Sequence, residues 1–122
     1  MKTTKAFLIV VSFLCMCSCK SESAKLQKLE GHWLLRDAED NETNVKDRMV
    51  GIFFEYDKNG TFTTNFNPAG DTTTGTYTLS SDKIILHNPD PLTFSIEELQ
   101  DSSLETSTTL RGHDFKLWLQ KQ

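Results

Sequence analysis

The stretch of sequence that decides the fold is Val50–Phe62, VGIFFEYDKNGTF. In its first half an apolar side chain falls at every second position, a period that is typical of a strand with one buried face. The tetrapeptide DKNG at 57–60 then supplies Asn and Gly, which accept the positive φ of a tight turn. The next apolar residue, Phe62, follows at once. The segment therefore predicts an antiparallel hairpin.

Short alternating runs of this kind recur on both sides of the hairpin, separated by turn residues. The run at Trp33 and Leu35 precedes it and is bounded by the polar stretch 37–47, for which we expect a loop. The expected strands lie at 33–35, 50–56, 62–66, 77–79, 84–86, 92–96, 104–110 and 115–119. Because no helical crossover separates them, the sequence predicts an all-β fold, a small antiparallel up-and-down barrel or meander of about eight strands.

The side chains expected to face inward alternate with threonine, serine and charged residues, which we expect on the exposed face. The expected inward residues are Trp33, Leu35, Ile52, Phe54, Tyr56, Phe62, Phe66, Tyr77, Leu79, Ile84, Leu86, Leu92, Phe94, Ile96, Leu104, Leu110, Phe115, Leu117 and Leu119.

A short helical turn is expected at residues 24–30, with Leu26 and Leu29 on one side and Gly31 as its C-terminal stop. The alternation of the last strand places Trp118 on the outer face. Either this indole packs under the helical turn, or it marks a docking patch for a partner.

The N-terminal segment has the features of an export signal. Lys2 and Lys5 precede an apolar run at 6–16, which is too short to span a hydrocarbon core of ~30 Å. All three cysteines of the chain lie between residues 15 and 19. This clustering disfavours both a disulfide framework and a cysteine metal site in the body of the protein.

The pair Ser18-Cys19 resembles the acceptor site of a bacterial lipoprotein signal, in which a small residue precedes the lipidated cysteine. Cys17 follows the bulkier Met16 and is the poorer acceptor. The resemblance implies a lipoprotein signal peptide at 1–18, a lipidated tether at 19–24, and a β-domain at 25–122. Attachment through acyl chains implies a place in the cell envelope, and we expect the outer membrane of a Gram-negative bacterium.

The expected mature part is acidic. The chain has 13 Lys and Arg against 17 Asp and Glu, and loss of 1–18 removes two lysines, which leaves a formal charge of −6. A field of this sign repels phosphate backbones, so we expect no nucleic acid as partner.

Three short motifs follow one another along the predicted sheet: Leu29, Gly31 and Trp33 as L-x-G-x-W, then YDKNGTF at 56–62, then GTYTL at 75–79. Together they resemble the short lipocalin-like lipoproteins of Bacteroidetes-type bacteria. The resemblance implies a lipocalin-like barrel in which Gly31 and Trp33 form the barrel-end motif. It further implies an arginine over the tryptophan, for which Arg111 is the candidate.

The same resemblance implies that the barrel mouth binds a small apolar ligand, lined by Phe54, Tyr56, Phe66 and Tyr77. The alternative is an interaction or structural envelope lipoprotein with a filled core, no ligand and an envelope protein as partner. An interior of eight strands is just wide enough for side chains or for one small ligand, so both remain open.

The common catalytic signatures are missing: the sequence has no Gly-x-Ser-x-Gly, phosphate-binding glycine loop or HExxH. We therefore expect no enzymatic activity and no cofactor. The three histidines, His32, His87 and His113, show no ligand spacing, and we expect no metal site. Asp71-Thr72-Thr73 resembles an O-glycosylation signal of Bacteroidetes-type secreted proteins, which makes Thr72 a candidate acceptor.

Overall fold

The computed structural model describes residues 24–87 and 91–122, and in these ranges one antiparallel sheet follows a short helix at residues 24–29. The strands are β1 (Gly31–Asp40), β2 (Thr43–Asn44), β3 (Phe53–Tyr56), β4 (Thr61–Thr64), β5 (Thr73–Ser80), β6 (Lys83–His87), β7 (Pro91–Leu99), β8 (Ser103–Leu110) and β9 (His113–Lys121). A 3-10 turn, η1 (Lys46–Arg48), lies between β2 and β3. The expected signal segment, Cys19 and most of the expected tether lie outside the described residues.

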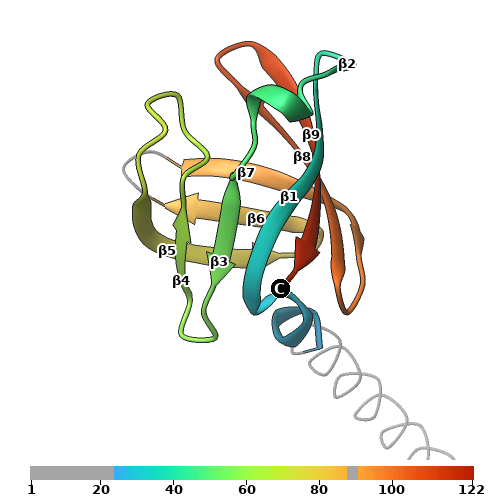
Figure 1. The fold of residues 1–122 in the computed structure, drawn as a ribbon. Coiled ribbons are helices and arrows are strands. Elements are labelled where there is room, and N and C mark those ends of the chain that lie inside the picture. The colour runs from blue at the N-terminus through green and yellow to red at the C-terminus, as the bar shows by residue number, and fades with distance from the viewer. Residues whose placement is uncertain (1–23, 88–90) are drawn as a thin grey trace, which may run out of the picture.

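The sheet closes into an up-and-down barrel of eight strands. Its order is β2-β1-β3-β4-β5-β6-β7-β8-β9, and β1 also pairs with β9. That closing pair runs from Trp33 opposite Lys121 to Asp40 opposite Phe115. The two-residue β2 is an additional strand at the edge of β1 (Figure 1). The predicted all-β fold class is confirmed. Of the two predicted architectures, the up-and-down barrel is the one observed, because β1 pairs with β9.

All eight expected strands are present, but the expected loop at 37–47 is wrong. β1 continues to Asp40, and a tight turn at Asn41 and Glu42, with φ of 48° and 70°, leads into β2. A β-bulge between Leu35 and Asp37 interrupts the alternation, so that Ala38 becomes the next buried side chain. Hydrogen bonding to β9 extends the strand beyond the point where its composition turns polar.

The run at 50–56 is shorter than expected. Val50 is 81% exposed and precedes β3, which begins at Phe53. The DKNG turn forms as predicted, since Tyr56 pairs with Phe62 and Gly60 takes a φ of 87°. The Asp57 carboxylate accepts a hydrogen bond from the Asn59 backbone N–H at 3.1 Å. The turn residues therefore fix the register of this hairpin.

Every side chain expected to face inward is buried or packs against the core. Three threonines, Thr64, Thr106 and Thr108, are buried as well, although most of the threonines were expected on the exposed face. Two of these hydroxyls donate to backbone carbonyls at 2.7 Å, Thr64 to Phe53 and Thr108 to Thr93. The positions of apolar residues predict the apolar part of the core. They do not predict which polar side chains are buried because a hydrogen bond satisfies them.

The N-terminal helix covers one end of the barrel through Leu29, which is fully buried, whereas Leu26 is 44% exposed. The indole N–H of the buried Trp33 donates to the Leu29 carbonyl at 2.8 Å. The Lys121 ammonium lies 5.1 Å from the centre of the Trp33 ring and donates to the Lys28 carbonyl at 2.8 Å. This end of the barrel is therefore closed by contacts between the two ends of the described chain.

Gly31 permits this closure. Its φ is 138°, and a Cβ at this position would lie 3.1 Å from Cε of Lys121. The expected arginine over Trp33 is wrong, because Arg111 lies in the turn before β9, at the far end of that strand. Lys121, at the end of β9, takes the place over the ring. The motif did not distinguish the two ends of the last strand.

Among the described residues, no helix has the length and apolar character needed to cross a membrane.

Candidate ligand site at the barrel mouth

The end of the barrel opposite Trp33 is open. Figure 1 shows the β1–β2 turn, η1, the β4–β5 loop and the β8–β9 turn together at this end, away from the N-terminal helix. A cavity of about 500 Å³ opens between them. Its apolar wall consists of Val45, Met49, Ile52, Pro68, Ala69, Phe66, Leu110 and Phe115. An adjoining cavity of about 380 Å³ shares Phe66, Asn67, Pro68, Leu110 and Arg111 with it.

The floor of the mouth is aromatic. The Phe66 ring lies 5.5 Å from that of Phe115, 5.9 Å from that of Phe94 and 5.8 Å from that of Phe54, measured between ring centres. Edge-to-face and tilted contacts of this kind favour a fixed arrangement of the rings. The mouth therefore lies over a set of packed aromatic rings.

The packed interior continues to the other end of the barrel through two tyrosines. Tyr56 and Tyr77 lie edge to face at 5.1 Å, and the Tyr77 hydroxyl donates to the Asp57 carbonyl at 2.9 Å. Burial raises the pKa of both hydroxyls, and the carboxylates of Glu30 and Asp57 raise that of Tyr77 further. Both side chains therefore stay neutral as part of the core.

The four aromatic residues expected to line the ligand site separate into two groups. Phe66 lines both mouth cavities. Phe54, Tyr56 and Tyr77 are buried in the stack beneath it and line neither cavity. The alternation of the sequence places all four inside the barrel, but only the tertiary structure gives their depth.

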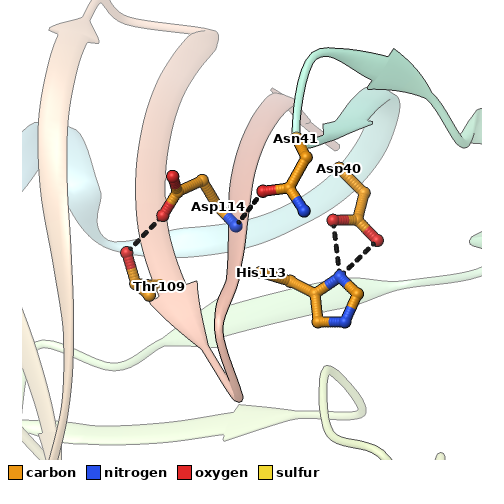
Figure 2. A network of polar contacts seen from close by, with 5 residues as sticks. All are labelled: Asp40, Asn41, Thr109, His113 and Asp114. Atoms are coloured by element: carbon orange, nitrogen blue, oxygen red, sulfur yellow. Dashed lines mark hydrogen bonds and ion pairs between the residues drawn. The ribbon is translucent and has the colours of Figure 1, made fainter.

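A polar network fixes one side of the rim, as Figure 2 shows. The Asp40 carboxylate lies 2.8 and 3.0 Å from Nδ1 of His113. Asn41 and Asp114 exchange two hydrogen bonds of 2.9 Å, and Thr109 donates to the Asp114 carboxylate at 2.8 Å. These contacts hold the β1–β2 turn against the β8–β9 hairpin.

Two arginines also line the mouth: Arg48 on η1 and Arg111 in the β8–β9 turn. The sequence does not connect them, because Arg48 lies between the expected loop at 37–47 and the next expected strand, and Arg111 was assigned to the closed end. No local pattern reveals that η1 and this turn meet. Their meeting is a consequence of barrel closure between β1 and β9.

The other residues named from the sequence lie apart from the mouth or on its edge. His32 stacks on Phe53, with ring centres 5.2 Å apart, and the His87 ring lies 3.3 Å from the Thr78 hydroxyl. In the described ranges, no three His, Cys, Asp or Glu side chains gather as a metal site. Thr72 is exposed in the β4–β5 loop.

Trp118 lies on the outer wall. It pairs with Asp37 of β1 and Glu105 of β8, and the Lys116 ammonium lies 5.3 Å from its ring centre. It lines a depression of about 430 Å³ to which the N-terminal helix contributes no residue. The helix docks instead through Leu29, beside Trp33.

Comparison with known proteins gives two matches. A family model described as a lipocalin-like domain matches residues 29–106. A crystal structure of a lipocalin-like protein from Bacteroides uniformis ATCC 8492 superposes with a TM-score of 0.57 at 24% identity, covering 78% of this chain and 99% of that one. At this identity the similarity shows the fold alone. No curated protein matches the chain significantly.

Proposed function

The chain belongs to the lipocalin-like domain family, and from this premise we propose that it is a secreted, lipid-anchored envelope protein that binds a small apolar ligand in its barrel mouth. The observation that carries the proposal is the open cavity of about 500 Å³ at the end opposite Trp33. Cavities that hold small molecules typically have volumes of roughly 300–1,000 Å³ and mainly apolar walls.

The position of the ligand follows from the packing beneath the mouth. The rings of Phe54, Phe66 and Phe94 are in mutual contact beneath the larger cavity. The ligand therefore lies across the rim, between η1 and the β8–β9 turn, with Phe66 beneath it.

Anchoring is proposed on the sequence context of Cys19, with the outer membrane as the location. The described chain begins at the closed end, where Leu29 packs beside Trp33. A lipid attached a few residues before the helix leaves the mouth at the opposite end, accessible from the aqueous phase. Thr72, on the exposed β4–β5 loop, is the proposed O-glycosylation acceptor.

The second candidate function is an interaction or structural lipoprotein without a ligand. The aromatic packing below Phe66 favours it, since most of the barrel interior is filled. The outer depression at Trp118 would then be the contact for an envelope protein.

A matched pair of substitutions separates the two functions. Leu110 lines both mouth cavities, and Leu110→Trp puts a larger ring into their shared wall. Leu34→Trp makes the same change on the outer face of β1, where Leu34 is 37% exposed. The readout is photolabelling of the full chain by a neutral dodecanol that carries a diazirine, with labelled peptides identified by mass spectrometry.

For a ligand-binding mouth, we expect labelling of the peptides around Phe66 and Leu110, loss of that labelling in Leu110→Trp and normal labelling in Leu34→Trp. Equal labelling of all three proteins, or none at the mouth, would instead support the filled-core alternative.

A further inference from the structure

The mouth carries positive charge beside its apolar wall. Arg48 of η1 and Arg111 of the β8–β9 turn both line the larger cavity, so two basic residues from different segments of the chain meet it. Arg111 also lines the adjoining cavity. Both residues are exposed, so a ligand at the rim can reach them.

Neither arginine has a carboxylate partner. Over residues 24–87 and 91–122, the ion pairs involve Lys25, His32, His113 and Lys116 but neither Arg48 nor Arg111. The single carboxylate that lines the larger cavity, Asp40, is already held by His113. The chain as a whole is acidic, with 17 Asp and Glu against 13 Lys and Arg, so the two unpaired arginines make the mouth a local exception in charge.

The other polar side chains of the larger cavity have structural partners. Asn65 accepts a hydrogen bond from the Phe53 N–H at 2.9 Å and donates to the Gly51 carbonyl at 3.0 Å. The Asn67 side-chain amide donates to the Asp71 carbonyl and accepts from the Asp71 backbone N–H. His113 is held by Asp40 through Nδ1, which leaves its Nε2. The guanidinium groups of Arg48 and Arg111 are therefore the donors of fixed positive charge left for a ligand.

We propose that the ligand is an amphiphile with one anionic head, which Arg48 and Arg111 bind while its apolar chain lies against Phe66, Leu110 and Phe115. The inference rests on the proposed ligand-binding function and adds the chemical class of the ligand. A guanidinium presents a planar fork of N–H donors that matches the oxygens of a carboxylate or a phosphate. An arginine pair at the edge of an apolar cup suits such a molecule and gives no advantage to a neutral one.

The test uses the full chain in phosphatidylcholine nanodiscs and three photoreactive probes with the same diazirine-bearing chain: dodecanoate, dodecyl phosphate and dodecanol. The variants are Arg48→Gln, Arg111→Gln and the double variant, with Arg36→Gln as the matched control. Arg36 is exposed on β1 and lines the outer depression, not the mouth. Because partition of each probe into lipid is the same for every variant, the variants are compared probe by probe.

We expect each mouth substitution to raise the half-saturating concentration of at least one anionic probe about tenfold, the effect of losing one charge-assisted hydrogen bond of ~1.4 kcal/mol. Labelling by dodecanol should be unchanged, which also shows that the variants are folded. Arg36→Gln should change no probe. Whether dodecanoate or dodecyl phosphate responds more strongly identifies the head group.

The proposal is overturned if the anionic probes and dodecanol respond alike in the arginine variants. If dodecanol labels the mouth and neither anion depends on the arginines, the ligand-binding function stands and only the anionic class is wrong. If no probe labels the mouth of the unmodified chain, the proposed function itself fails, and the anionic class fails with it.

Discussion

At the scale of single residues, one buried side-chain group in the described part of the barrel lacks a hydrogen-bond partner. The Thr106 hydroxyl is buried and has no hydrogen-bond partner among the described residues, whereas the Thr108 hydroxyl donates to the Thr93 carbonyl. An unpartnered buried hydroxyl costs free energy, because folding removes its hydrogen bonds to water and replaces none of them. Thr106 is therefore a position where a polar side chain reduces stability.

We expect Thr106→Val, which keeps the shape of the side chain, to raise the free energy of unfolding by about 1 kcal/mol. The matched change Thr108→Val removes a hydrogen bond of 2.7 Å and should lower it by a similar amount. Urea denaturation followed by tryptophan fluorescence measures both values. A loss of stability in Thr106→Val as large as that in Thr108→Val would show that the Thr106 hydroxyl has a partner, such as a bound water.

At the scale of secondary-structure elements, β1 connects the two ends of the molecule. Its first residues form the closed end with the helix and β9, and its last residue, Asp40, lines the mouth. The β-bulge after Leu35 allows both, because it moves Ala38 onto the buried face. One strand thus carries Trp33, pairs with β9 to close the barrel, and contacts His113 at the rim through Asp40.

The closed end predicts a specific order of stabilities. Trp33→Ala should lower the free energy of unfolding by roughly 3–5 kcal/mol, because it empties a fully buried site. Lys121→Met keeps the methylene chain over the indole and removes the charge, so it should cost less than about 1 kcal/mol. Arg111→Met, in the turn at the mouth, should change stability least. Thermal melting ranks the three variants, and an Arg111→Met variant less stable than Lys121→Met would contradict the assignment of the two ends.

At the scale of the whole molecule, the proposed attachment of the barrel to a membrane can be tested at Cys19. We predict that Cys19→Ala abolishes lipidation and leaves the precursor uncleaved or mislocalised, because Ser18-Cys19 is the proposed acceptor site. Metabolic labelling with a palmitate analogue and membrane fractionation measure both effects. The matched change Cys17→Ala should leave labelling intact. Label that persists in Cys19→Ala and disappears in Cys17→Ala would move the acceptor to Cys17.

The sequence alone determined the fold class and the inward face of every expected strand. This succeeded because alternation and turn residues such as Asn59 and Gly60 act locally, between neighbours in the chain. The extension of β1 to Asp40 was missed, since hydrogen bonding to β9 outweighs the polar composition of that segment.

Tertiary structure alone decided which end of the barrel is open and what lines it. Lys121, not Arg111, lies over Trp33, and Phe66 is the one expected aromatic residue that reaches the mouth cavities. Arg48 and Arg111 meet there only because β1 closes on β9. Alternation reports whether a side chain points inward, but depth along the barrel depends on strand register and stagger, which arise only when all the strands are assembled.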